Sequence, residues 1–342
     1  MNKYLYTPYE FITDLIDNID RAHDTVWIQT MYFETGNHTK LLEKALIRAR
    51  KRGVEVKIYI DWITEKYANG ELDIFPSFSK VRRTSNKNTR HASRMMFELF
   101  EKNSIEVIFT NQPNTIQRIV PIVGRNHIKL FLVDQVGWIG GMNLGDKNFE
   151  SIDLMVKMQN ISVVQSLYNQ FLKINSLSLS QDHMVTCDFE NNLLVDKGLR
   201  GQSIIFKKAL ELTSHAQSNI IYISQFTPDS ELLSNIIESA KQGINISIIT
   251  SYKKDKVYSQ FPFNCIYSYF IHKIKSYPNI KLVHKNQHVH AKLLIVDEKE
   301  VLFGSHNMTK LSVFLGTQEL SLYSRDKELV TELTEYAHSL MV

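Results

Sequence analysis

Residues 126–143 read NHIKLFLVDQVGWIGGMN, and residues 289–307 read VHAKLLIVDEKEVLFGSHN. Each stretch carries the pattern His-x-Lys-x4-Asp and then, after a turn, a glycine with an asparagine three residues later. A single His-x-Lys pair on a strand is most often ordinary surface, but repetition of the whole pattern in one chain indicates a shared function. The paired residues are His127, Lys129, Asp134 and Asn143 in the first stretch, with His290, Lys292, Asp297 and Asn307 in the second.

The segments ahead of the two motifs repeat as well. Residues 25–62 read as a β-branched strand, a helix with apolar residues at helical spacing, a glycine and a second strand. Residues 219–251 follow the same order, and each half adds a third strand, at 104–110 and 279–285, before its motif. Strand, helix, strand units favour parallel pairing through right-handed crossovers, so we expect an α/β fold with mixed, largely parallel sheets.

The chain is long enough for two domains, since it has 342 residues and one domain usually takes about 100–200. The repeat divides it into a first half at 1–175, with the motif at 127–134, and a second half at 198–342, with the motif at 290–297. A helix around Val163–Ile174 is expected to end the first half. The polar, Ser-rich residues that follow are interpreted as a linker at 176–197.

The composition, with 43% hydrophobic and 22% charged residues, is that of an ordinary globular protein. A net charge of +4 gives no global argument for nucleic acid. The two cysteines, Cys187 and Cys265, stand far apart and exclude a disulfide scaffold. No run approaches the ~20 apolar residues of a membrane-spanning helix, and the first residues lack the order of a signal peptide. We therefore expect a cytoplasmic protein that is at most peripheral to a membrane.

Strand geometry decides which motif residues act together. Residues two apart share a face, so His127 projects with Lys129, and His290 projects with Lys292. The two aspartates of the candidate catalytic set, at 134 and 297, have the opposite parity, and we expect them to support loops or neighbouring side chains. Paired lysines supply positive charge to a phosphate while it is attacked.

Two histidines can divide the remaining work of a phosphodiester reaction. One neutral imidazole attacks phosphorus and forms a covalent phosphohistidine, while the other, protonated, gives a proton to the leaving oxygen. In a second step the second histidine activates water or an alcohol, which displaces the enzyme. This scheme requires no metal and no cofactor, and we expect neither.

Two copies of HxKxxxxD, followed by GGMN at 140–143 and GSHN at 304–307, resemble the motifs of the phospholipase D superfamily. The resemblance covers nearly the whole chain. It implies two pseudo-twofold-related α/β/α halves with one active site at their interface, His127 as the nucleophile and His290 as the general acid and base. The residues that it implies at the phosphate are Lys129, Lys292, Asn143 and Asn307.

Members of this superfamily also carry an acidic residue beyond each motif that bonds the histidine. Asp153, in NFESIDLMVK, and Glu319, in GTQELSLY, stand at the matching positions. A buried carboxylate there would fix the tautomer of its imidazole and raise its basicity. Both residues therefore join the candidate site.

Within the superfamily, GRNHIKLFLVD, GGMNLGD and IDLMVKM are similar to the first motif region of cardiolipin synthases, although the approach to the second motif, KNQHVHAK, departs from the pattern. The chain lacks the amino-terminal transmembrane hairpin of many such enzymes and so resembles their shorter members. We expect phosphatidyl transfer between phospholipids at a membrane surface. The alternative is an endonuclease that hydrolyses DNA or RNA. A non-catalytic lipid binder is disfavoured because both motifs are intact.

Two further segments bear on the substrate. A basic run in the first half, without a clear counterpart in the second, comprises Lys80, Arg82, Arg83, Lys87, Arg90 and Arg94, with His91. A basic loop there would suit anionic lipid headgroups or a nucleic-acid backbone, and an exposed, solvated charge run is the other reading. The aromatic residues 258–274 are interpreted as a core helix rather than a membrane-surface segment. His284, His288 and His306 are interpreted as non-catalytic.

Overall fold

The two motif strands are buried on both faces. In β7, Leu130–Val133, and β15, Leu293–Val296, all residues are buried. Residues 130 and 132 face the cluster between the two sheets, whereas residues 131 and 133 face the outer helices. A strand covered on both faces reads as a continuous apolar run, which explains LFLV and LLIV in the sequence.

The computed structural model describes residues 4–68, 71–72, 80–114, 117, 123–173, 181–251 and 263–342. The first part of the chain forms β1 (Leu5–Tyr6), α1 (Pro8–Arg21), β2 (Thr25–Thr30), α2 (Thr39–Lys51), β3 (Glu55–Asp61), η1 (Trp62–Lys66), β4 (Tyr67–Ala68), β5 (Glu71–Leu72), α3 (Lys80–Lys102), β6 (Glu106–Thr110), β7, β8 (Val136–Gly140), α5 (Asp146–Phe149), β9 (Met155–Met158) and α6 (Ile161–Lys173). The remainder forms β10 (His183–Thr186), β11 (Asn191–Lys197), α7 (Ile204–Ser214), β12 (Asn219–Ile223), α8 (Ser230–Lys241), β13 (Asn245–Ser251), α10 (Phe263–Ile274), β14 (Ile280–Lys285), β15, β16 (Glu300–Gly304), α11 (Lys310–Leu315), β17 (Gln318–Ser324) and α12 (Lys327–Ser339).

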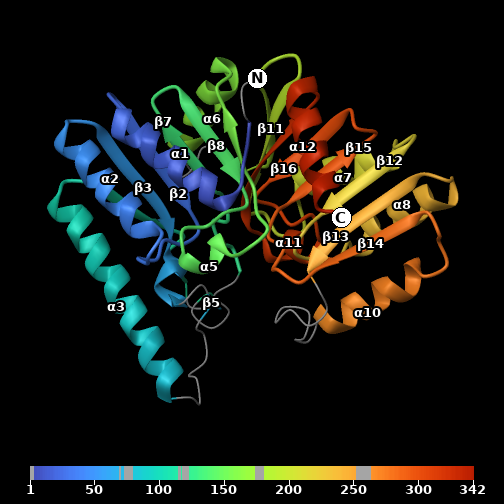
Figure 1. Ribbon diagram of the computed structural model, residues 1–342, viewed down its shortest axis with the longest axis horizontal. Coiled ribbons are helices and arrows are strands. Elements are labelled where there is room, and N and C mark those ends of the chain that lie inside the picture. The colour runs from blue at the N-terminus through green and yellow to red at the C-terminus, as the bar shows by residue number, and fades with distance from the viewer. Residues whose placement is uncertain are drawn as a thin grey trace.

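Two sheets stand side by side, each built from one half of the chain (Figure 1). The seven-stranded sheet has the order β1-β9-β8-β7-β2-β3-β6, and the eight-stranded sheet has the order β10-β11-β17-β16-β15-β12-β13-β14. From β9 to β6 and from β17 to β14 the two orders are equivalent. The expected pair of related halves with mixed sheets is therefore confirmed.

The sheets are mixed, as expected, but the expectation that they are largely parallel is wrong, because antiparallel strand pairs outnumber parallel ones among the described strands. Parallel pairs join β2 to β3, β3 to β6, β12 to β13 and β13 to β14. The strands that follow each motif pair antiparallel, as β7 does with β8 and β15 with β16. Their short connecting turns permit only antiparallel pairing, because a parallel connection needs a crossover of a dozen or more residues.

The stretch expected to be a linker, 176–197, contains the hairpin of β10 and β11. β11 pairs with β17 over its whole length, so the second sheet begins before residue 198. The polar residues of the stretch concealed the hairpin. The apolar residues of β11, at 193–195, are too few for a period to stand out in sequence, and residues 174–180 lie outside the described part of the chain.

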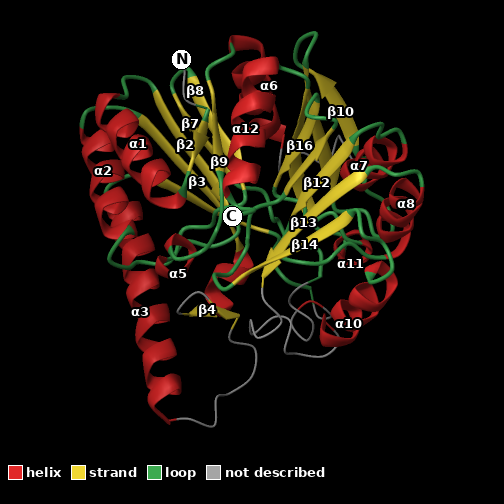
Figure 2. Ribbon diagram, turned by 45° about the vertical axis from the view of Figure 1, so that its right-hand side comes forward, coloured by secondary structure: helices red, strands yellow, loops and turns green. Residues whose placement is uncertain are grey.

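Helices form three layers around the two sheets. α6 and α12 lie between the sheets (Figure 2) and bury apolar residues of both. α1, α2 and α3 cover the outer face of the first sheet, and α7, α8 and α10 cover the outer face of the second. Within the described residues, no helix is both long enough and apolar enough to cross a bilayer.

The basic run at 80–94 belongs to helix α3 rather than to a loop. α3 connects β3 to β6 as α10 connects β13 to β14, so the run does have a counterpart, and the counterpart is the aromatic stretch. Phe270 and Ile274 of α10 pack in the outer core of the second half, as expected of a core helix. Residues 258–262 of that stretch lie outside the described residues.

The two motif aspartates hold the amino ends of their sheets. The carboxylate of Asp134 accepts backbone N–H groups from residues 23, 24 and 25, and that of Asp297 accepts them from residues 217, 218 and 219. Both aspartates have positive φ angles, 48° and 56°, which aspartate tolerates better than most residues. They therefore fix the turn after β7 and β15 to the start of β2 and β12, far from the histidines.

We predict that Asp297→Ala lowers the free energy of unfolding by about 1–2 kcal/mol, because several backbone N–H groups lose a charged acceptor. Partial burial alone would raise the pKa of Asp297, but these hydrogen bonds outweigh it and lower the pKa. The stabilisation is therefore present at neutral pH and is lost as the pH falls below about 4. Urea denaturation at pH 7 measures it. The exposed control Asp17→Ala should shift stability by less than about 0.5 kcal/mol, and an equal effect of both would contradict the prediction.

Candidate active site

The backbone just ahead of each motif strand pairs with the opposite half of the molecule. Residues 125–127 bridge Gln318, with the N–H of residue 127 donating to its carbonyl at 2.9 Å. Residues 288–290 bridge Ile152, with the N–H of residue 290 donating to its carbonyl at 2.8 Å. The histidines thus lie just before β7 and β15 rather than on them. These bridges draw both motifs to one interface.

Each histidine is bonded by the carboxylate of the other half. His127 Nδ1 lies 3.0 Å from Glu319 Oε1, and His290 Nδ1 lies 2.7 Å from Asp153 Oδ2. The side chains of the two acids are nearly inaccessible, at 1% and 0% exposure, whereas the imidazoles keep 13% and 12%. The site is therefore shared between the halves, and each half alone would lack the partner of its histidine.

The hydrogen bonds also fix the tautomer of each neutral imidazole. His127 Nδ1 faces two acceptors, the Ser305 carbonyl at 3.1 Å and the Glu319 carboxylate, so Nδ1 carries the proton. His290 Nδ1 likewise faces the Asp153 carboxylate. In both rings the lone pair is then on Nε2, the nitrogen that can attack phosphorus or accept a proton.

The two motif lysines are buried beside the histidines. Lys129 and Lys292 are 1% and 0% exposed, and each ammonium donates to the carbonyl of its own motif histidine, Lys129 at 2.5 Å. Burial lowers the pKa of Lys292 to about 8 and that of Lys129 well below its usual value, although Asp153 and Glu319 act against the shift. The charges of Asp153 and Glu319 act on both lysines, so these four groups form one electrostatic cluster.

The same cluster keeps the imidazoles neutral in the free protein. Burial, reinforced by the charge of Lys292, lowers the pKa of His290 to about 3 despite Asp153. Burial also lowers the pKa of His127 despite Glu319. For the two carboxyls, burial would raise the pKa, but their histidine and lysine neighbours outweigh it and hold the pKa low. In the free protein, each neutral imidazole is thus bonded to an ionised carboxylate.

Asn143 and Asn307 follow the glycine turns after β8 and β16. The Oδ1 atom of each is buried and has no hydrogen-bond partner among the residues that the structure describes. The turns need glycine, because a Cβ at Gly140 would lie 2.2 Å from the Leu154 carbonyl, and one at Gly304 would lie similarly close to the paired strand. Each asparagine thus has a buried amide oxygen that can still accept a hydrogen bond.

Sequence reasoning missed a buried ion pair beside the first motif. Arg125 Nη1 lies 3.1 Å from Asp61 Oδ1, and both side chains are essentially inaccessible. Asp61 Oδ2 also accepts the N–H of Asn126 at 2.6 Å, so the pair fixes the segment that enters His127. The available signals were a carboxylate at the end of a strand and an arginine two residues before the histidine. The second half uses Ser251 at this place.

A second missed residue is Ser305, whose hydroxyl donates to the Glu319 carboxylate. Its counterpart in the first half is Gly141, where a Cβ would lie 2.3 Å from Asp153 Oδ1. The alignment of GGMN with GSHN shows that Gly141 and Ser305 occupy equivalent positions. Their contacts with the two carboxylates could not be inferred from the sequence, because they depend on the fold. The two carboxylates therefore have different surroundings.

The three histidines that were interpreted as non-catalytic from the sequence lie near the candidate site. His284 bonds the hydroxyl of Tyr267, and His306 is buried with its Nδ1 accepting the N–H of Met308 at 2.8 Å. The His288 ring centroid lies 5.9 Å from that of His290. Over the described ranges, no three His, Cys, Asp or Glu side chains gather as a metal-ligand group.

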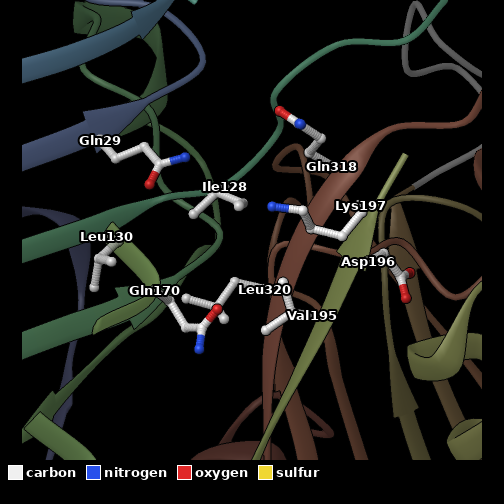
Figure 3. A pocket seen from close by; sticks show the side chains of 9 residues that line it. All are labelled: Gln29, Ile128, Leu130, Gln170, Val195, Asp196, Lys197, Gln318 and Leu320. Atoms are coloured by element: carbon white, nitrogen blue, oxygen red, sulfur yellow. The ribbon is translucent and has the colours of Figure 1, made fainter. Parts of the chain in front are cut away.

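A small cavity of about 10 Å³ lies between the halves on the face of β7 opposite to His127 (Figure 3). Gln29 and Lys197 reach toward it from opposite sides, whereas Asp196 turns away. Its volume suits about one water molecule and is far too small for a phospholipid head group. This cavity is therefore not a phospholipid site.

The family model described as "Cardiolipin synthase, PLD-like domain" matches residues 15–175 and 210–341. The chain belongs to the phospholipase D superfamily, in its cardiolipin synthase branch. It is 23% identical to the major cardiolipin synthase ClsA of Bacillus subtilis, over 86% of this chain and 59% of that protein. It is 24% identical to a cardiolipin synthase of Listeria innocua, over 96% and 66%. The chain thus spans roughly three fifths of the length of these phospholipase D superfamily relatives.

Solved structures support the phospholipase D-like fold. The phosphatidylserine synthase of Haemophilus influenzae has a TM-score of 0.73 at 14% identity and covers 99% of this chain and 85% of its own. The polyphosphate kinase of Porphyromonas gingivalis has a TM-score of 0.60 at 12% identity, with 99% and 50% covered. At these identities the likeness concerns the fold, and membership of the superfamily identifies the chain as one of its enzymes.

We predict that His290 stays neutral down to about pH 4 and that Lys292→Met raises its pKa, because a neighbouring positive charge is removed. Nitrogen-15 NMR of the imidazole measures this. Since an unfolded histidine protonates near pH 6.5, burial of neutral His290 should also make stability fall as the pH drops from 6.5 toward 3. The exposed control Lys299→Met should leave the titration unchanged, and an imidazolium at His290 at pH 6 would contradict the account.

Proposed function

We propose that the protein transfers a phosphatidyl group between phospholipids through a phosphohistidine, in the manner of a cardiolipin synthase. The observation that carries the proposal is the pair of imidazoles from opposite halves, each oriented by a buried carboxylate and accompanied by a buried lysine. The names of the relatives favour a phospholipid over a nucleic acid as substrate.

In the first step, Nε2 of His127 attacks the phosphorus of a donor such as phosphatidylglycerol. A P–N bond forms, the bond from phosphorus to the oxygen of the head-group glycerol breaks, and protonated His290 gives its proton to that oxygen, so that free glycerol leaves and the phosphatidyl group stays on His127. The negative charge of the bound phosphodiester raises the low pKa of His290 and so favours the protonated form that this step requires.

In the second step, neutral His290 takes the proton from the hydroxyl of an acceptor, such as a second phosphatidylglycerol. The acceptor oxygen attacks phosphorus, the P–N bond breaks and His127 is restored. Lys129 and Lys292 stabilise the phosphoryl oxygens, and Asn143 and Asn307 complete the donors around them. Asp153 and Glu319 hold the imidazoles and stabilise their positive charge.

We predict that His127→Ala lowers the conversion of phosphatidylglycerol vesicles to cardiolipin and glycerol by at least about 1,000-fold, because no covalent intermediate can form. The assay buffer contains a metal chelator, and the products are identified by mass spectrometry. Acid-quenched wild-type protein should carry a phosphatidyl adduct on His127, and the exposed control His215→Ala should keep full activity.

The same protein preparation should also be incubated with single- and double-stranded DNA. Chelator-resistant DNA cleavage without a lipid product would contradict the proposal and favour the nuclease. Full turnover by His127→Ala would contradict the assignment of the nucleophile.

A further inference from the structure

Helix α3 is longer than the strands it connects. Its 23 residues span roughly 34 Å at ~1.5 Å per residue, whereas the 7 residues of β3 span roughly 23 Å. Its last residue leads directly into the amino end of β6, so its carboxyl end lies level with the start of the strands. Its amino-terminal half therefore projects beyond the carboxyl ends of β3 and β6, as Figure 1 shows.

The active site lies at the same edge of the sheet. β7 begins at Leu130, which pairs with Gln29 near the carboxyl end of β2, so His127 stands at this edge. η1 directly follows β3 there, and its Glu65 lies 3.7 Å from Arg94 of α3. Arg94 lies just past the projecting half of α3, which therefore flanks the edge at which His127 lies.

The projecting part of α3 is strongly basic. From residue 80 to residue 91 it contains five lysines and arginines and neither aspartate nor glutamate, and Arg94 follows in the next turn. Arg83, Lys87, Arg90 and Arg94 follow a spacing of four, three and four residues and so share one face of the helix. Three apolar side chains on another side of the helix are also exposed: Val81 near its start, at 80%, and Met95 and Leu99 toward its carboxyl end, at 47% and 44%. A basic helix that also exposes apolar side chains beside its charged face is typical of segments that lie on anionic membranes.

The same edge carries aromatic residues paired with lysine in both halves. Lys66 lies 5.5 Å from the ring of Trp62 in η1, and both line a surface hollow of about 430 Å³. In the second half, the exposed Tyr269 of α10 has Lys273 at 5.4 Å from its ring. Tryptophan, tyrosine and lysine favour the interface between a bilayer and water.

We propose that the amino-terminal half of α3 is a docking helix that holds this edge of the protein against an anionic lipid bilayer. The choice of a lipid surface rests on the proposed function. A nucleic-acid backbone would also match the charge, but it would not bury the exposed Val81 of α3 or the exposed Tyr269 of α10, which a bilayer interface would. The docked helix presents the site to head groups in the membrane plane.

The test compares two triple variants with equal loss of charge. Arg82→Gln/Arg83→Gln/Lys87→Gln removes exposed charges from the projecting half, and Lys51→Gln/Lys102→Gln/Lys299→Gln removes exposed charges from the opposite edge. Binding is measured by co-sedimentation with vesicles of equal phosphatidylglycerol and phosphatidylcholine. We expect the first variant to bind roughly 100-fold more weakly than wild type and the second to bind nearly as well, since each charge near the surface contributes roughly five- to tenfold.

Equal loss in both variants, or no loss in the first, would overturn the proposal. So would a first variant that keeps vesicle binding but loses binding to duplex DNA, because the partner would then be nucleic acid. Turnover of phosphatidylglycerol in neutral detergent micelles separates the two proposals. The first variant should keep that turnover, whereas its absence in wild-type protein that still binds vesicles would count against the proposed function alone.

Discussion

The structure depends on two crossed contacts between an imidazole and the carboxylate of the opposite half. Buried carboxylates and ammonium groups are costly unless each meets a partner, and here the partners arrive only when the halves dock. His127 needs Glu319, and His290 needs Asp153. The backbone bridges at Gln318 and Ile152 set the register of that docking. The interface between the two halves and the candidate active site are therefore the same region of the molecule.

The duplicated halves are alike in topology but not in chemistry. The carboxylate behind His127 has the hydroxyl of Ser305, whereas the one behind His290 lies against Gly141. The segment entering the first motif is fixed by the buried pair of Asp61 and Arg125, which the second half does not repeat. A reaction with a nucleophile and a separate acid and base needs two different histidines. The repeat supplies the two positions, and their neighbours differ, as the proposed division of roles requires.

The sequence allowed the motifs, the repeated strand and helix units and the supporting role of Asp134 and Asp297 to be inferred, because these follow from local periodicity. It also allowed Asp153 and Glu319 to be chosen as histidine partners through the family resemblance. Which acid meets which histidine depends on how the halves pack, and no local pattern carries that information. The hairpin of β10 and β11 and the helical state of the basic run were missed for a related reason. Polar residues dominate both segments, and their structure depends on the sheet beside them.

In the proposed mechanism both histidines contact one phosphate at the same time. A crystal structure of the protein with vanadate, a mimic of phosphorus under attack, tests it most directly. We expect one vanadate with Nε2 of His127 bonded to vanadium, Nε2 of His290 bonded to a vanadate oxygen, and both lysine ammonium groups close by. A vanadate held by one histidine with the other out of reach would contradict the account.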